Sequence, residues 1–455
     1  MKFDILGTKL ITLHDGSIGI EQHKLIYDNM TSELTYEDGT EVPVELVRQT
    51  DHRDFSTYRN APVITQQNPG KKSNKISTLK IQLGFSCNYS CNYCSQKFVE
   101  RGDQTNVKLV EKFLSNVDTW LHDAPRRIEF WGGEPFVYWK LLKPLAESLR
   151  TKFPETRFSV ITNGSLLTYD INEWLEQMGF SVAISHDGPG QHVRGPDPLE
   201  DPKQRAIILD LWNRLHKRNR ISFNSMINKH NLSRAAVIEY FDQLLGADTN
   251  YLLGEGGFIA AYDPDGLENS TMSHKDYIEY RNRTLFEIQN LKSTKFHVFY
   301  SRLNEWINSF ANKRPAGVIG QACTMDREDV ITVDLRGNVI TCQNTTAAST
   351  APNGRSHLIG HVSKLENVKL TTSTSWAARP NCSNCPVVQL CRGNCMYLEG
   401  ENFATTCEAY YNDHIPFLAT AIELATGILP YEIHPHEGSL PPGREILWAE
   451  TEGLQ

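Results

Sequence analysis

The placement of the cysteines constrains this chain more than any other feature of its sequence. All ten cysteines fall into two groups. The first group is the short run Cys87-x3-Cys91-x2-Cys94. The second is a long ordered series, Cys323-x13-Gly337-x4-Cys342 followed by Cys382-x2-Cys385-x5-Cys391-x3-Cys395-x11-Cys407. Thiolates gathered in this way in a large chain usually hold metal, and iron–sulfur clusters are the leading interpretation.

Length and charge narrow the class of protein. At 455 residues the chain exceeds what one hydrophobic core normally serves, so two or three domains are expected. The formal net charge of −8 gives no bulk electrostatic reason to expect nucleic acid or an anionic membrane as a partner. No run approaches the roughly 18 apolar residues of a membrane span, and the N-terminus lacks a signal-peptide pattern. We therefore expect a cytoplasmic protein with reduced thiols.

The rhythm of the sequence changes near residue 75. Residues 1–75 contain short alternating segments with Asp-Gly turns, typical of a small antiparallel sheet, and the polar stretch 66–75 is a predicted linker. From residue 78 onward, strand-like and helix-like segments alternate, which builds a parallel sheet with right-handed crossovers. The predicted strands are 79–84, 127–133, 158–164, 180–188, 221–227 and 256–262, and the predicted helices lie near 106–122, 138–152, 170–179, 199–218 and 233–245.

Six such units suffice for a partial (β/α)6 barrel, in which the chemistry gathers at the carboxyl ends of the strands. A mostly helical stretch near 273–313 follows, and 415–429 is a predicted helix before a Pro-rich tail. The predicted fold class is therefore α/β. Its predicted parts are a β-rich domain at 1–75, the partial barrel at 76–313, a cysteine-rich domain at 314–412, and a C-terminal helix and tail at 413–455.

The first cysteine group directly follows the first predicted barrel strand. Three thiolates hold three irons of a [4Fe–4S] cube, so the fourth iron stays open to a small ligand that brings its own donor atoms. Zinc is the alternative. A zinc ribbon needs four ligands in two close pairs, however, and nothing near Cys87, Cys91 and Cys94 completes such a set.

Polar motifs follow three other predicted strands. They are Trp131-Gly132-Gly133-Glu134-Pro135, Thr162-Asn163-Gly164 and Ser185-His186-Asp187. Glycines permit a close approach of the backbone to a ligand, and Glu134 supplies a counter-charge. Taken alone, the pentapeptide is equally well explained as a β-to-α turn with a helix-starting Glu-Pro pair.

Together these motifs resemble the radical S-adenosylmethionine (SAM) enzymes, whose Cys-x3-Cys-x2-Cys pattern this chain matches in full. The resemblance implies that SAM chelates the open iron through its methionyl amine and carboxylate. One electron from the cluster then cleaves the sulfonium and releases a 5′-deoxyadenosyl radical. The implied SAM contacts are Tyr93 by the adenine, Gly132, Gly133, Glu134 and Pro135 at the ammonium, Ser185 and Asp187 at the ribose, and further Asn163 and Arg194. Tyr93 is equally a core residue, and Asn163 and Arg194 are equally turn or surface residues.

The seven-cysteine series resembles the SPASM extension of the same superfamily, including the position of Gly337. The resemblance implies two auxiliary [4Fe–4S] clusters. Cys382, Cys385, Cys391 and Cys407 would ligate one cluster, and Cys323, Cys342 and Cys395 the other. The second set is one thiolate short, so a side chain, water or substrate completes it or it stays incomplete. A zinc ribbon on the two close cysteine pairs would leave three cysteines unexplained.

The resemblance spans about residues 79–410 and implies a reaction on peptides or proteins. Sulfatase maturases carry an acidic base directly after the equivalent of Cys342, whereas this chain has Gln343, whose amide cannot take a proton as a carboxylate does. Every cysteine is allotted to a cluster, so no free thiol remains for an epimerase. We therefore predict a maturase that abstracts hydrogen from a ribosomal precursor peptide and closes an intramolecular carbon–carbon, ether or thioether crosslink.

The predicted partners are the precursor peptide and a flavodoxin- or ferredoxin-type reductant, with neither nucleic acid nor membrane. Residues 1–75 have about the size of a peptide-docking module, and a simple cap over the barrel is an equal alternative. His186, His192 and Asp187 are candidate acid/base residues. Three alternatives stay open: sulfatase-maturase-like oxidation of a protein Cys or Ser, a multi-cluster electron-transfer protein without radical chemistry, and a radical enzyme acting on a small molecule.

Overall fold

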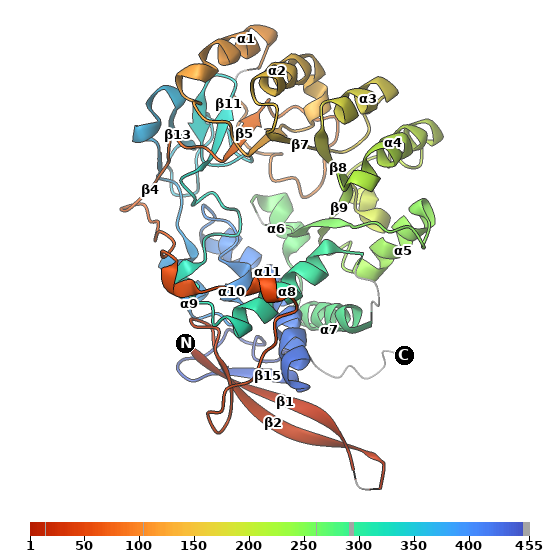
Figure 1. Ribbon diagram of the computed structural model, residues 1–455, viewed down its shortest axis with the longest axis vertical. Coiled ribbons are helices and arrows are strands. Elements are labelled where there is room, and N and C mark those ends of the chain that lie inside the picture. Colours follow the sequence, from red (N-terminus) through yellow and green to blue (C-terminus); the bar gives the residue numbers. More distant parts are fainter. Residues whose placement is uncertain (14, 103, 261, 291–294, 449–455) are drawn as a thin grey trace.

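A mostly parallel sheet of nine strands organises the computed structural model, which describes residues 1–13, 15–102, 104–260, 262–290 and 295–448 (Figure 1). Six of its strands follow one another in space as they do along the chain, and each pairs in parallel with the next. They are β5 (Thr78–Gln82), β6 (Arg127–Trp131), β7 (Arg157–Thr162), β8 (Phe180–Ser185), β9 (Ile221–Ile227) and β10 (Gly254–Phe258). The predicted α/β class with a partial (β/α)6 barrel is confirmed.

Helices connect these strands along the rim of the sheet, as Figure 1 shows. They are α1 (Val107–Asn116), α2 (Trp139–Lys152), α3 (Tyr169–Gln177), α4 (Pro202–Leu215) and α5 (Arg234–Leu245). Four of them begin at a side chain that accepts a hydrogen bond from the first helical turn, namely Asn106, Thr168, Asp201 and Ser233. Such caps satisfy backbone N–H groups that have no partner inside the helix, so the local sequence fixes where each crossover helix begins.

Successive side chains of each barrel strand point in turn toward the helices and toward the barrel interior. Phe130, Phe158 and Phe180 are buried on neighbouring strands, and their ring centroids lie 5.5–5.6 Å apart. Residues adjacent to them in sequence, including Glu129 and Ser159, line a cavity inside the barrel. The barrel therefore has an apolar outer layer toward the helices, and polar side chains are among those that line its interior.

The cysteine-rich region adds three strands to this same sheet. β11 (Val330–Asp334) pairs in parallel with β5, and β12 (Asn338–Ile340) and β13 (Leu358–His361) continue from it in antiparallel order. Gly337 lies in the turn between β11 and β12 with φ +85°, a backbone conformation that favours glycine. These strands were not predicted, because their pairing with β5 joins residues far apart in the sequence.

A second sheet, in the order β15-β1-β2-β3, lies at the lower end of the molecule in Figure 1. It consists of β1 (Lys2–Thr12), β2 (Ile18–Asp28), β3 (Leu34–Tyr36) and β15 (Leu429–Pro435), all antiparallel. The antiparallel sheet predicted within the first 75 residues is confirmed. Its fourth strand, however, comes from the C-terminal segment that was predicted as a tail. The predicted linker contains β4 (Gly70–Lys71), which pairs with β14 (Lys369–Leu370).

The remaining helices lie between the two sheets. They are α6 (Pro264–Ser270), α7 (His274–Asn290), α8 (His297–Ala311), α9 (Pro380–Ser383), α10 (Val388–Cys391) and α11 (Gly400–Thr426). The helical stretch predicted near 273–313 is confirmed. The predicted helix 415–429 overlaps the second half of α11, which starts much earlier, contains Pro416 and ends at Thr426. Within the described ranges, no helix is both long and apolar enough to cross a membrane.

Candidate active site

The first three cysteines lie in the loop after β5, at the carboxyl ends of the barrel strands. Backbone hydrogen bonds fold this loop tightly, because the N–H of Cys94 donates to the carbonyl oxygen of Cys91 at 3.2 Å. The N–H of Tyr89 donates to the Sγ of Cys87 at 3.3 Å. All three cysteines line one cavity of about 170 Å³, together with residues from the ends of β6, β7 and β8. The loop therefore presents three thiols to a single space.

The Gly-Gly-Glu-Pro turn after β6 runs along the start of this loop. The N–H of Gly133 donates to the carbonyl oxygen of Gly84, and the N–H of Glu134 donates to that of Ser86, both at 3.0 Å. A Cβ atom on Gly133 would lie 2.5 Å from the carbonyl oxygen of Ser86 and 2.7 Å from that of Phe85. Any side chain would therefore push the two backbones apart, which explains glycine at this position.

Glu134 lines the cavity but directs its carboxylate to the protein. Its Oε1 accepts from the N–H of Phe136 at 3.1 Å and from the hydroxyl of Thr162 at 2.8 Å, and its Oε2 accepts from the N–H of Asn163 at 2.7 Å. The side chain is almost fully buried, and burial raises the pKa of Glu134 while these hydrogen bonds oppose the rise. The carboxylate thus joins the ends of β6 and β7, and its predicted contact with the SAM ammonium remains a prediction.

Asn163 ties the end of β7 to the cysteine loop. Its Nδ2 donates to the Oδ1 of Asn88 at 2.9 Å, and its Oδ1 accepts from the hydroxyl of Ser165 at 2.6 Å. Asn88 in turn donates to that hydroxyl at 2.8 Å. These three side chains close a ring of hydrogen bonds beside Cys87, so the structure brings Asn163 to the predicted site.

Tyr93, Asp187 and Arg194 form a buried cluster next to the cavity. The Tyr93 hydroxyl donates to Asp187 Oδ2, and the Arg194 guanidinium lies 2.8 Å from the Tyr93 hydroxyl and 3.3 Å from Asp187 Oδ1. The N–H of Met226 also donates to Asp187 Oδ1, at 2.9 Å. Arg194 lines the cavity, whereas Tyr93 and Asp187 lie outside its lining as far as the described residues show. Their predicted adenine and ribose contacts remain predictions.

Ser185 and the two histidine candidates differ in position. Ser185 lines the cavity at the end of β8. His186 is fully buried on the other face of the chain, where its Nε2 lies 2.9 Å from Asp197 and its Nδ1 accepts from the N–H of Gly188 at 3.0 Å. His192 is exposed. Neither histidine is among the described residues that line the cavity, so the structure does not place either one for proton transfer there.

Four cysteines of the second group are close electrostatic neighbours. Burial raises the pKa of Cys382 and of Cys385 to about 12, and the negative charge of Cys407 also raises both pKa values. Burial also raises the pKa of Cys391 well above its usual range, followed by the charges of Cys407, Cys385 and Cys382. The structure therefore brings these four thiols together, between α9, α10 and α11.

The other three cysteines form a second set. Burial raises the pKa of Cys342 to about 12, and the charges of Cys395 and Cys323 add to the rise. The Tyr262 hydroxyl is a neighbour of the Cys395 thiol and opposes the effect of burial on the Cys395 pKa. This set thus offers three thiols and a neighbouring phenol.

The donor chemistry of the three sets suits iron–sulfur clusters. Four thiolates match a fully ligated [4Fe–4S] cluster, and each three-thiol set matches a cluster with one iron open. A thiol binds a metal as its thiolate, so metal binding at these buried thiols releases their protons to the solvent. Across the part of the chain that the structure describes, no three His, Cys, Asp or Glu side chains converge closely enough to hold a single metal ion.

Lys80 joins the barrel interior to the Cys342 segment, and no motif marks it in the sequence. Its Nζ donates to the Oε1 of Gln343 at 3.1 Å and lies 3.8 Å from Glu129. The side chain is buried on β5, and its positive charge lowers the pKa of Cys342. A lysine inside the mostly apolar segment LKIQLG is unusual, but the sequence does not show that its partner is Gln343.

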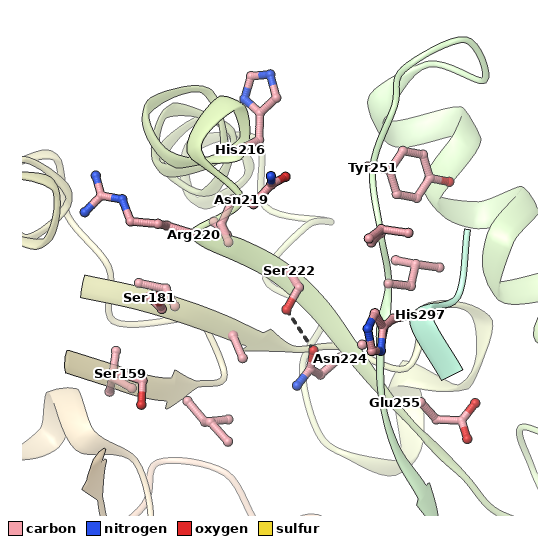
Figure 2. A pocket seen from close by; sticks show the side chains of 18 of the residues that line it. Ser159, Ser181, His216, Asn219, Arg220, Ser222, Asn224, Tyr251, Glu255 and His297 are labelled. Carbon is pink, nitrogen blue, oxygen red and sulfur yellow. Dashed lines mark hydrogen bonds between the residues drawn. The ribbon is translucent and has the colours of Figure 1, made fainter. Parts of the chain in front are cut away.

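A larger cavity of about 740 Å³ occupies the barrel interior (Figure 2). Figure 2 shows Ser159, Ser181 and Ser222 on neighbouring strands of its wall, with the Ser222 hydroxyl donating to Asn224 at 3.0 Å. Ile161 lines both this cavity and the one that contains the cysteine loop. The two cavities therefore adjoin, and the larger one has the volume of a small-ligand or side-chain site.

Comparison with known sequences identifies the barrel. A sequence profile of the Radical SAM superfamily matches residues 81–241. The radical SAM cyclopropyl synthase TigE of Paramaledivibacter caminithermalis is 21% identical over 412 residues, which cover 83% of this chain and 81% of that enzyme. A GTP 3′,8-cyclase of Campylobacter lari is 27% identical over 171 residues, 37% of this chain and 51% of that enzyme.

Solved structures show the same fold. The structure of native anSMEcpe with bound AdoMet superposes with a TM-score of 0.55 at 17% identity, covering 77% of this chain and 99% of that one. The same protein with bound AdoMet and Cp18Cys peptide gives a TM-score of 0.54 at 17% identity, with the same coverage of both chains. The profile match contains the cysteine loop, the Gly-Gly-Glu-Pro turn and Ser185-His186-Asp187, and the TigE relationship extends over most of the chain. The profile match and this relationship identify residues 81–241 as a radical SAM domain, and the protein as a radical SAM enzyme.

Proposed function

We propose that this enzyme is a peptide maturase with a C-terminal SPASM extension at residues 314–412. It abstracts hydrogen from a ribosomal precursor peptide and closes an intramolecular crosslink. The observation that carries this proposal is the grouping of all ten cysteines into one set at the barrel cavity and two sets beyond it. Three cluster sites in one chain suit a reaction in which closing a new bond releases an electron that needs an acceptor.

The bond type is proposed from the relative that matches most of the chain. That protein is a cyclopropyl synthase, and a cyclopropyl group contains only carbon–carbon ring bonds. Among carbon–carbon, ether and thioether closure, we therefore favour carbon–carbon closure. The neutral Gln343 argues in the same direction, because its amide cannot serve as the base that oxidation of a protein Cys or Ser requires.

Cys87, Cys91 and Cys94 would hold the cluster that supplies the electron for reductive cleavage of SAM to the 5′-deoxyadenosyl radical. The residues proposed to hold SAM itself are Tyr93, Gly132, Gly133, Glu134, Pro135, Asn163, Ser185, Asp187 and Arg194. Ser185 and Arg194 line the cavity directly. Glu134 and Asn163 fix the strand ends around it through the hydrogen bonds described above.

The reacting part of the peptide would enter the barrel interior. Ile161 lines both this cavity and the one with the cysteine loop, so a side chain bound there would lie next to the proposed SAM site. The fold neighbour anSMEcpe has been solved with a bound peptide, which supports a peptide as substrate. Residues 1–75 are proposed to dock the peptide or to cap the barrel. A flavodoxin- or ferredoxin-type reductant in the cytoplasm would supply electrons.

The test is anaerobic turnover of a candidate precursor peptide. Reconstituted enzyme, SAM and dithionite are incubated with the peptide, and the product is analysed by mass spectrometry. A carbon–carbon crosslink removes two hydrogens, so the peptide becomes about 2 Da lighter. Tandem mass spectra then locate the linked residues.

Two variants control this experiment. Cys91→Ala should abolish the mass change and the formation of 5′-deoxyadenosine together, because it removes a ligand of the proposed radical-generating cluster. Ser90→Ala changes a neighbour that also lines the cavity and should leave the product detectable. Formation of 5′-deoxyadenosine without any change in a peptide would instead favour a small-molecule substrate.

A further inference from the structure

The segment that follows β15, residues 436–447, is here called the C-terminal return. It turns back, runs antiparallel beside β15 and reaches the four-cysteine set. Glu432 and Ile446 form an antiparallel bridge. The N–H of Ile433 donates to the carbonyl oxygen of Glu445 at 2.8 Å, and the N–H of Leu447 donates to that of Tyr431 at 2.9 Å. The return is therefore bound to the second sheet on one side.

Two helices hold the other side of the return. Arg281 of α7 is buried and donates to the carbonyl oxygens of Gly443, at 2.9 Å, and Ile446. Tyr411 of α11 donates its hydroxyl proton to the carbonyl oxygen of Arg444. Gly443 has φ +78°, and a Cβ atom there would overlap the ring of His274. The position of the next residue, Arg444, is thus fixed by its surroundings.

Arg444 places its guanidinium against a cysteine of the set. Its Nη2 lies 3.7 Å from the Sγ of Cys407, and its Nε and Nη2 lie 2.8 and 2.6 Å from one carboxylate oxygen of Glu408. The guanidinium also lies over the ring of Tyr411, 4.6 Å from its centroid. The residue is 8% exposed, so water screens its charge little. A planar guanidinium held on three sides is a fixed donor to the sulfur.

We propose that Arg444 is a positioning residue that raises the reduction potential of the cluster bound by Cys382, Cys385, Cys391 and Cys407. This inference rests on the proposed function, which assigns a cluster to those cysteines. Reduction adds a negative charge to a cluster, and a nearby cation and a hydrogen bond to a ligand sulfur both stabilise the reduced form. Arg444 therefore makes this cluster a better electron acceptor.

Glu408 limits that effect and supplies a second test. Its carboxylate pairs with Arg444 and also accepts from Asn412 at 2.9 Å, so it holds the guanidinium in place while offsetting part of the charge. Removing the charge of Glu408 should move the potential in the direction opposite to removing that of Arg444. A purely structural role for Arg444 predicts no such opposition.

The experiment is a redox titration followed by electron paramagnetic resonance. It uses the full chain with Cys87, Cys91 and Cys94 replaced by alanine, so that only the auxiliary clusters contribute signals. A further Cys407→Ala change identifies the signal of the four-cysteine set. Arg444→Gln, Arg444→Lys and Glu408→Gln are then compared. Arg48→Gln is the matched control, because Arg48 is exposed and pairs with Asp51 at 3.1 Å, as Arg444 pairs with Glu408.

We expect Arg444→Gln to lower the reduced-to-oxidised ratio about tenfold at a fixed potential, which corresponds to 59 mV for one electron. Glu408→Gln should raise the ratio, Arg444→Lys should shift it less than Arg444→Gln, and Arg48→Gln should leave it unchanged.

An unchanged potential in Arg444→Gln with full iron content would overturn the inference. If Arg444→Gln loses the cluster, the test is made with Glu408→Gln instead. A reduction potential that is unchanged or lowered in Glu408→Gln also overturns the inference. Failure of the proposed function looks different, because Cys407→Ala would then remove neither iron nor a signal from the parent protein.

Discussion

At the scale of single residues, close approach and hydrogen bonding explain the motif around the cavity. Gly133 is required because the backbone of Phe85 and Ser86 passes where its side chain would lie. Glu134 is required because three donors converge on its carboxylate. Both residues therefore shape the site even before any ligand is considered.

Gly133→Ala should displace the start of the cysteine loop, since its methyl group meets backbone oxygens rather than a flexible side chain. We expect loss of iron from the first cluster and at least about a tenfold loss of 5′-deoxyadenosine formation. The reason is that displacing reacting groups by about 1 Å lowers the reaction rate by that factor or more. Iron analysis and product assay check this. Gly102→Ala is the control, because a Cβ atom there meets open space. Equal iron and activity in both variants would contradict the explanation.

Glu134→Gln keeps the size of the side chain but replaces one carboxylate oxygen by an NH2 group. That group would face the donors of Phe136 and Thr162 or that of Asn163. Leaving buried donors unsatisfied costs about 1–3 kcal/mol, so we expect a measurable fall in thermal stability together with weaker SAM binding. Calorimetry and equilibrium dialysis measure the two effects. Unchanged values for both would show that the carboxylate does not organise the site.

His357 predicts a dependence of stability on pH. Burial lowers its pKa from 6.5 to about 4, and its Nδ1 has no hydrogen-bond partner among the described residues. The unfolded chain therefore binds this proton more readily than the folded chain, so the folded state loses stability as the pH falls from 6.5 toward 4. His357→Gln should flatten this part of the curve of melting temperature against pH. Parallel curves for both proteins would contradict the assignment.

At the scale of elements, aromatic packing between sheet and helices stabilises the barrel. Phe158 of β7 is fully buried and contacts Phe130 and Phe180 on the adjacent strands. Phe158→Ala should reduce the free energy of unfolding by about 3–5 kcal/mol, because it leaves a cavity in a layer that cannot collapse. Chemical denaturation measures the loss. A value near zero would mean that this layer repacks freely.

Elements with a local pattern were predictable from the sequence, and those with distant partners were not. β7 and β8 alternate apolar and polar residues, which is visible locally. The strand predicted at 256–262, of which residue 261 lies outside the described residues, corresponds to β10 at Gly254–Phe258, and its bounds differ because the glycines of β10 give no apolar pattern. β15 pairs with β1 across the length of the chain, as in Phe3 with Pro435. α11 was predicted too short, since Gly400 and Pro416 are usually helix breakers.

The candidate site divides in the same way. The cysteine loop and the motif after β6 could be identified by residue type and spacing, and the structure places them on one cavity. Lys80 and Arg444 could not be identified from the sequence, because their roles depend on contacts with residues far away in the chain. Lys80 contacts Gln343, and Arg444 contacts Cys407. The hydrogen bond between Tyr93 and Asp187 was also not predictable, since sequence spacing does not show how a carboxylate side chain is oriented.

At the scale of the whole molecule, one continuous sheet joins the barrel to the cysteine-rich region. β11 pairs with β5, and the first cysteine loop follows β5 directly. Gln82 of β5 donates to the carbonyl oxygen of Thr345 at 2.7 Å, three residues beyond Cys342. The proposed radical site and the proposed auxiliary site are therefore supported by the same strand, which fixes their relative positions.

The central claim is that Cys87, Cys91 and Cys94 hold a cluster that cleaves SAM, while the other seven cysteines hold clusters of their own. The most direct test measures 5′-deoxyadenosine and protein-bound iron together in the reconstituted wild type, Cys91→Ala and Cys407→Ala. We predict 5′-deoxyadenosine from the wild type and none from Cys91→Ala, which should keep its auxiliary iron. Cys407→Ala should lose auxiliary iron and still cleave SAM. Cleavage that persists in Cys91→Ala, or a wild type with full iron that yields no 5′-deoxyadenosine, would contradict the account.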